Sequence, residues 1–303
     1  MVLLAQQLIN GLILGSIYGL IATGYTMVYG IIGMINFAHG EIYMISAYLF
    51  AIFLALCAMF GIDSLAVSLV VTLVLTVAIT GLYGWAVERV AYRPLRQSAR
   101  LAPLISAIGM SLVLQNYVQL AQGAREQGVR PLVEGVLRFG SESDFFQITY
   151  IQLLIVAAAV LAMAALTFLI NRTALGRACR ATQQDRVMAG LLGIDTDRVI
   201  SLVFVIGASM AAVAGILITL NFGSFNFFIG FIAGVKAFTA AVLGGIGSLP
   251  GAMLGGIVLG LSESLFAGFV KTDYKDVFAF GLLVAVLVFR PTGLLGRPAV
   301  EKI

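Results

Sequence analysis

Charged residues are scarce in this chain, because Asp, Glu, Lys and Arg together make up 11% of its 303 residues. A soluble globular domain carries roughly 25%. Hydrophobic residues make up 61% of the chain, and its mean hydropathy is +1.06. This composition excludes a soluble domain and predicts a protein whose solvent is the lipid bilayer. The net charge of +4 is then a signal of membrane orientation rather than of nucleic-acid binding.

Side chains that carry chemistry are scarce too. The chain has two cysteines, Cys57 and Cys179, and a single histidine, His39. They provide no disulfide framework, no zinc-ligand spacing and no catalytic Ser/His/Asp or Cys/His set. The sequence also lacks a Walker A motif, so the chain does not hydrolyse ATP itself. We therefore expect no catalytic residue, no cofactor and no metal.

Apolar runs dominate what remains, and a helix needs about 20 such residues to cross a membrane. Nine candidate spans cover residues 4–28, 42–60, 65–87, 101–120, 151–170, 199–220, 229–243, 251–269 and 277–289. The run 229–243 is short and contains Lys236, so the number falls to eight if this run is re-entrant. The sequence predicts an all-α polytopic membrane protein: residues 1–303 form a single transmembrane domain, a bundle of eight or nine segments with at least one discontinuous helix.

Loop charges predict the orientation. Basic residues concentrate in the segments 88–100, 171–198 and 290–303, and the positive-inside rule places all three in the cytoplasm. The segment 121–150 contains four acidic residues and is expected outside. Counting back through the spans places the N-terminus outside, and the C-terminus is cytoplasmic.

Two glycine-containing stretches, residues 30–41 and 221–230, interrupt the apolar sequence. They share the pattern Asn-Phe-x-x-Gly at 36–40 and 226–230, and on the predicted topology they lie on opposite sides of the membrane. Paired interruptions are typical of discontinuous helices beside a transport pathway. Chance explains a five-residue match equally well, so we favour a discontinuity at the first stretch over a true internal repeat.

Polar residues inside the spans are candidates for function, because ionisable groups are costly there. A polar stripe, Ser111, Gln115 and Gln119, follows one helical face with Asn116 beside it. It predicts either a hydrophilic path or interhelical hydrogen bonds. His39 and Glu41 are too few for a metal site, and a satisfied polar pair at a helix break is the favoured alternative. Our candidates for the translocation pathway are Asn36, His39, Glu41, Gln115 and Asn116.

The segment 171–198 is the longest cytoplasmic loop. Thr182 is a candidate N-cap for a helix over 184–192, which Gly193 would end. Four apolar residues would share one face of this helix: Val187, Met188, Leu191 and Leu192. Such a face can dock into a groove of a partner protein or lie on anionic lipid headgroups, and both interpretations remain open.

Several stretches carry a resemblance to a known family. They are GYTMVYGIIGMINFAHGE at 24–41, ERVAYRP at 88–94, LISAIGM at 104–110, GRACRA at 176–181, LLGI at 191–194, AFTAAVLGGIGS at 237–248 and RPTGLLGRP at 290–298. With them the chain resembles the LivH family, the permease subunits of bacterial high-affinity branched-chain amino-acid ABC importers. The chain departs from the pattern of this family mainly in residues 121–149.

This resemblance implies a heteromeric importer in the bacterial inner membrane. A second permease of similar fold would pair with this chain, two cytoplasmic ATPases would dock beneath it, and a periplasmic binding protein would deliver Leu, Ile or Val. The helix over 184–192 would then be the coupling helix. The residues expected to dock the ATPase are Gln184, Asp185, Arg186, Ala189 and Leu192.

Other classes of function are weighed against this one. A stand-alone secondary transporter or channel would need a coupling-ion site, and the scarcity of acidic residues in the spans argues against one. A membrane-embedded enzyme would need a catalytic cluster, which is not visible. A permease for urea or amides within the same importer class stays open.

Overall fold

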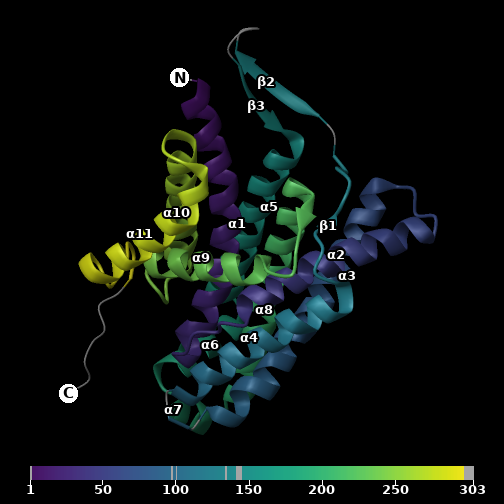
Figure 1. Ribbon diagram of the computed structural model, residues 1–303. Helices are drawn as coiled ribbons and strands as arrows, with labels where there is room; N and C mark the ends of the chain where they lie inside the picture. Colours follow the sequence, from purple (N-terminus) through teal and green to yellow (C-terminus); the bar gives the residue numbers. More distant parts are fainter. Residues whose placement is uncertain (1, 97, 100, 134, 141–144, 297–303) are drawn as a thin grey trace.

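The computed structural model describes residues 2–96, 98–99, 101–133, 135–140 and 145–296 (Figure 1). Within these residues, seven helices are long and apolar enough to cross a membrane. They are α1 Val2–Ile32, α2 His39–Met59, α3 Leu65–Val87, α4 Leu101–Gln122, α5 Tyr150–Arg172, α8 Thr196–Phe222 and α10 Leu249–Phe269. A π-helical turn and a 3₁₀ turn continue α3 as far as Leu95. The predicted all-α polytopic class is confirmed.

The two remaining predicted spans are also helices, but shorter ones. They are α9 Ile229–Gly244, with 16 residues, and α11 Lys275–Phe289, with 15. Both fall short of the roughly 20 residues that cross the hydrocarbon. The expected eight or nine segments are thus seven full-length helices and two shorter ones within the described part of the chain.

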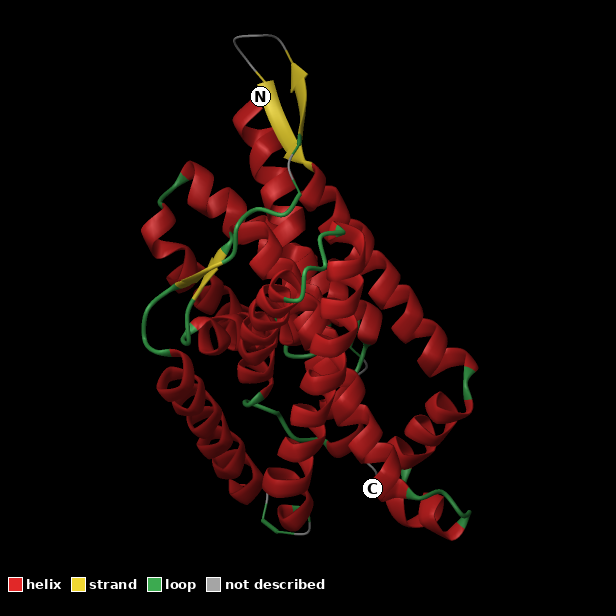
Figure 2. Cartoon of the chain, turned by 90° about the vertical axis from the view of Figure 1, so that its right-hand side faces the viewer, coloured by secondary structure: helices red, strands yellow, loops and turns green. Residues whose placement is uncertain are grey.

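The two ends of the molecule differ in structure. At one end, β2 Val136–Gly140 and β3 Phe145–Thr149 form an antiparallel hairpin (Figure 2). The start of α1 lies at this end, because the backbone N–H of Gln147 donates to Oε1 of Gln6 at 3.0 Å. The short helices α6 Ala174–Gln184 and α7 Arg186–Leu191 lie at the opposite end (Figure 1).

The same local geometry occurs twice in the chain. After α1, Gly33 adopts a φ of +72°, and after α8, Gly223 adopts a φ of +68°. An asparagine follows each glycine at the same interval, and the backbone C=O of this asparagine accepts the first N–H of the next helix. These bonds run from His39 to Asn36 at 3.0 Å and from Ile229 to Asn226 at 3.3 Å. Each break therefore ends one long helix and starts another.

The packing of the helices shows the same repeat between the two halves of the chain. Helix α1 packs against α8, α9 and α10, just as α8 packs against α1, α2 and α3, while α2 and α9 pack on each other. The end of α1 and the start of α8 both lie beside α6 and α7. Helices α1 and α8 therefore run antiparallel, and the two halves of the chain are inverted relative to each other. The Asn-Phe-x-x-Gly match could have arisen by chance on the sequence alone, but in the structure it marks a repeat. We favoured a discontinuity at the first stretch over a repeat, and the structure has both: the discontinuity lies between Ile32 and His39. The repeat is hard to recognise in the sequence because few side chains outside the motif retain it.

Glycines allow the closest approach in the core, where α1 meets α10. Gly11, Gly15 and Gly19 face Leu261, Ile257 and Met253. A Cβ atom at Gly15 would lie 2.6 Å from the Cα atom of Ile257, well inside van der Waals contact. Small residues bring helices together where lipid supplies no hydrophobic driving force.

A Gly15→Ala variant should therefore be destabilised by about 1–3 kcal/mol through overpacking. Gly109 on α4 is the matched control, because a Cβ atom there meets nothing within 4 Å. Thermal unfolding in detergent, followed by intrinsic fluorescence, measures the difference. Equal midpoints for Gly15→Ala and Gly109→Ala would contradict the packing argument.

Candidate functional site

The predicted helix over 184–192 is two helices instead of one. Thr182 lies inside α6, where its hydroxyl donates to the C=O of Ala178 at 2.8 Å, so its prediction as an N-cap was wrong. The N-cap is Asp185, whose Oδ1 accepts the backbone N–H groups of Val187 at 2.9 Å and Met188 at 3.0 Å. An aspartate in extended geometry satisfies the free N–H groups of the following turn. Gly193, with φ +84°, ends the second helix as expected.

Helix α7 presents an apolar surface. The side chains of Val187, Met188, Leu191 and Leu192 are 75%, 53%, 77% and 74% exposed. Gln184 and Asp185 are exposed beside them. This combination of apolar side chains on a short capped helix, outside the spans, suits a groove of another protein.

Two other predicted residues of this site face inward. Ala189 is buried, and the Arg186 guanidinium donates to the backbone C=O of Ile31 at 3.0 Å, near the end of α1. Arg186 and Ala189 therefore attach α7 to the bundle, whereas Leu192 lies on the outer surface.

The predicted pathway residues do not form one cluster. Asn36 accepts a hydrogen bond from the Tyr92 hydroxyl at 3.1 Å. His39 packs edge-on against Tyr25, with ring centroids 4.7 Å apart. Glu41 accepts a hydrogen bond from Ser111 at 3.1 Å, so the polar stripe on α4 does meet the start of α2. All three candidate residues at the break are buried.

The two candidates on α4 differ from each other. Gln115 is half-buried on the same face as Ser111. Asn116 is exposed, and its amide donates to the C=O of Leu112 in its own helix at 2.7 Å. Of these two candidates, Gln115 continues the stripe that Ser111 begins and Asn116 does not.

A charged cluster holds the ends of α3 and α8 together. Glu88 is completely buried and accepts hydrogen bonds from Arg96 and, at 2.7 Å, from Ser201. Arg96 also binds Asp197, to which Arg93 donates at 2.7 Å. The cluster lies at the end of the molecule that carries α6 and α7. Sequence reasoning treated these arginines only as orientation signals.

A second charged cluster lies in the other half, and sequence reasoning missed it. Lys236 on α9, 3% exposed, contacts Glu263 on α10 and Asp276 on α11, each at 2.6 Å. Its ammonium also donates to the Tyr18 hydroxyl at 3.4 Å. A signal for this pair was present in the sequence: Lys236 and Glu263 have opposite charges, and each is the only ionisable residue in its apolar run, one run following the other along the chain. The cluster joins four helices within the membrane.

Cys179 lies on α6, outside the spans, and the reactivity of its thiol should depend on pH. Burial raises the pKa of its thiol above the ordinary value. A raised pKa lowers the fraction of thiolate at neutral pH, and the thiolate is the nucleophile. We expect slow modification by maleimide at pH 7 and faster modification as the pH rises through the pKa, measured by mass spectrometry of intact protein. Rapid modification at pH 7 would contradict this burial.

Comparisons with known proteins agree on one family. The family model described as "Branched-chain amino acid transport system / permease component" matches residues 7–287. The permease protein BraD of Pseudomonas aeruginosa is 55% identical over 98% of this chain and 97% of its own length. LivH of Escherichia coli is 56% identical over the same shares of the two chains. LivM of Escherichia coli is 29% identical over 92% of this chain and 68% of its own length. No solved structure matches the chain.

Proposed function

Because the chain belongs to the family of branched-chain amino-acid transport permease components, we propose that it forms the translocation pathway of an ABC importer that moves Leu, Ile and Val into the bacterial cytoplasm. It is a multi-pass membrane protein, and residues 1–303 act as one translocation domain. The high identity to named permease proteins supports this function over a secondary transporter or channel.

The observation that carries the proposal is the exposed apolar face of α7. ATP hydrolysis belongs to other chains, because this one contributes no nucleotide motif. Two cytoplasmic ATPases dock on the α6–α7 end of the importer, with Gln184, Asp185 and Leu192 at the contact. Arg186 and Ala189 pass the movement to the bundle. Closure of the ATPase dimer would then tilt α1 and open the pathway alternately to each side.

The orientation follows from this docking. The α6–α7 end lies in the cytoplasm together with the C-terminus, and the chain spans the bacterial inner membrane. The N-terminus and the hairpin β2–β3 then lie in the periplasm, where a binding protein delivers the amino acid. The partner permease is a second chain of similar fold, and the 29% identity of LivM to this chain supports such a pairing.

The closed section of the pathway is proposed at the start of α2. Asn36, His39 and Glu41 lie there, beside the contact of Gly40 with Gly230 and Gly234 of α9. A separation of α2 from α9 would expose these polar groups on the side that faces α9, because close glycine packing covers them there. Gln115 would border the same opening next to Ser111, and Asn116 would face the second permease.

Purification of the tagged chain from its native membrane in a mild detergent tests the proposal. We expect two ATPase chains and a second permease to co-purify in fixed ratio, as identified by mass spectrometry. A lone chain or a homo-oligomer, reproducible in several detergents, would refute the importer. Uptake that persists after ATP depletion and collapses with an ion gradient would identify a secondary transporter instead.

A further inference from the structure

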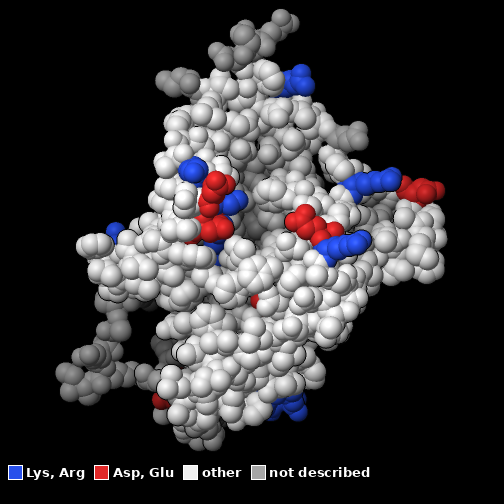
Figure 3. Space-filling view, in the orientation of Figure 1, with Lys and Arg blue, Asp and Glu red and all other residues white. Residues whose placement is uncertain are grey.

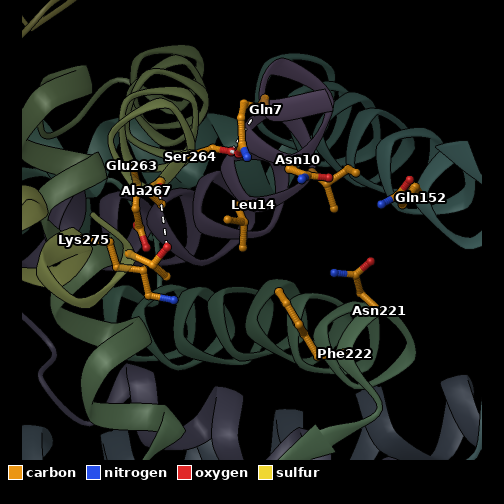
Figure 4. Close-up of a pocket in the computed structure, with 12 residues that line it drawn as sticks. Gln7, Asn10, Leu14, Gln152, Asn221, Phe222, Glu263, Ser264, Ala267 and Lys275 are labelled. Carbon is orange, nitrogen blue, oxygen red and sulfur yellow. Dashed lines mark hydrogen bonds between the residues drawn. The ribbon is translucent and has the colours of Figure 1, made fainter. Parts of the chain in front are cut away.

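A polar cavity opens in the half of the molecule that carries the hairpin. Its volume is 360 Å³, and it lies between α1, α5, the end of α8, α10 and the start of α11. Figure 3 shows a hollow on this face, beside a group of acidic and basic side chains. The amides of Gln7, Asn10, Gln152 and Asn221 line the cavity together with Lys275 (Figure 4). Four amides and an ammonium are an unusual lining for a space between apolar helices.

Glu263 supplies the opposite charge at the cavity wall. Its side chain is buried, and Oε1 accepts a hydrogen bond from Lys236 at 2.6 Å. Its Oε2 is also buried, and no hydrogen-bond partner exists for it among the described residues. A buried carboxylate oxygen without a donor is destabilising, by roughly 1–3 kcal/mol or more for a charged group. A ligand that brings a donor satisfies it once a rotation of the carboxylate turns Oε2 toward the cavity.

The charges around Glu263 favour a cationic donor. Lys236 is shared between two carboxylates, the buried Glu263 and the partly exposed Asp276, so this group carries an excess of negative charge. Across the cavity, Lys275 and the amides of Asn10 and Asn221 can donate to an anion. Ile13, Leu14 and Phe222 add an apolar wall. The cavity therefore offers an acceptor, donors and an apolar surface to one small molecule.

We propose that this cavity binds a free aliphatic amino acid as its zwitterion. The α-ammonium donates to Oε2 of Glu263, the α-carboxylate accepts from Lys275 and the nearby amides, and the aliphatic side chain packs on Leu14 and Phe222. The inference rests on the proposed importer function and names the site that receives the substrate from outside. Charge-assisted hydrogen bonds at both ends of the zwitterion replace its hydration.

The inverted repeat relates the contacts at the two ends of the bundle. At the inner end, ionic contacts among Glu88, Arg96 and Asp197 join α3 to α8. The equivalent contact at the outer end joins α10 to α1 through a neutral hydrogen bond from Ser264 to Gln7 at 2.8 Å. The inner end is thus joined by ionic contacts and the outer end by a neutral one, and a cavity is present at each end. A ligand can enter the cavity from outside in this conformation.

The test measures binding of radiolabelled leucine to the whole importer complex in nanodiscs, without the binding protein. Two competitors test the two charged groups of leucine one at a time. The first, 4-methyl-2-oxopentanoate, lacks the ammonium, and the second, isopentylamine, lacks the carboxylate. We expect Glu263→Gln to weaken leucine binding at least about tenfold, a change of 1.4 kcal/mol, and to leave competition by the oxo acid unchanged. Glu126→Gln removes an exposed acid in the outer segment and is the control. Leucine binding to Glu263→Gln at wild-type strength would overturn the proposal.

A second measurement covers the case in which Glu263→Gln does not assemble. An Ala267→Cys variant places a thiol on the cavity wall without removing a proposed ligand, and a membrane-impermeant maleimide added from outside should modify it. Leucine should slow this modification more strongly than the oxo acid does, because the oxo acid lacks the ammonium that binds Glu263. Modification that leucine does not slow would refute the site. If the wild-type importer takes up leucine while either result is negative, the site fails and the importer function stands. If the wild-type importer takes up none, the function itself fails.

Discussion

An Asp185→Ala/Leu192→Ala double variant should assemble in the membrane but lose leucine uptake. Removal of the Asp185 carboxylate leaves the first N–H groups of α7 without their acceptor, which costs about 0.5–2 kcal/mol. A helix of 6 residues cannot absorb that loss and should unwind at its start. The Leu192 change removes an anchor that is 74% exposed. Because 1.4 kcal/mol of lost docking energy is a factor of ten, uptake should fall about tenfold or more.

Two controls separate docking from general damage. Asp185→Asn keeps an N-cap acceptor and should retain most of the uptake, because asparagine caps helices as well as aspartate does. Leu120→Ala removes a still more exposed leucine at the outer end of α4 and should change nothing. The measurement is ATP-driven uptake by proteoliposomes, together with the ATPase rate of the purified complex. Normal uptake by the double variant would refute α7 as the coupling helix.

The spans could be predicted from the sequence because the bilayer imposes a one-dimensional constraint. Backbone groups in hydrocarbon must pair within a helix, so each apolar run of sufficient length becomes one. All nine predicted runs are helices. The boundaries were less certain: α1 continues past residue 28 to Ile32, where Gly33 ends it with a positive φ. Helices end where capping geometry stops them and not where hydropathy falls.

The packing could not be predicted from the sequence in the same way. The repeat is retained in the spacing of Gly33 and Asn36 with Gly223 and Asn226, while most other side chains have diverged. The capping residue of α7 was missed because Thr182 and Asp185 are both good N-caps, and only the end of α6 at Gln184 decides between them. The cavity combines side chains from α1, α5, α8, α10, α11 and the turn between the last two helices, and it has no signature in any one of them.

Among single substitutions in the membrane core, Lys236→Met should destabilise the protein most. It leaves Glu263 and the partly buried Asp276 without their cation. Removal of one partner from a buried ion pair costs roughly 3–5 kcal/mol, because the remaining charge is not compensated. Arg198→Met is the control, since its pair with Asp195 is exposed and should contribute only about 0–1 kcal/mol. The thermal midpoint of the detergent-solubilised protein, compared among these variants, measures both effects.

The triple variant Lys236→Met/Glu263→Gln/Asp276→Asn separates folding from function. It removes all three charges at once, and replacement of a complete buried ionic group by neutral residues is often tolerated. We expect the midpoint to return toward the wild-type value, while leucine binding stays lost because Glu263 no longer accepts the ammonium. A triple variant as unstable as Lys236→Met would show that the hydrogen bonds to Tyr18 and Glu263, and not the charge balance, hold these helices together. A stable triple variant that still binds leucine would assign the cluster to folding alone.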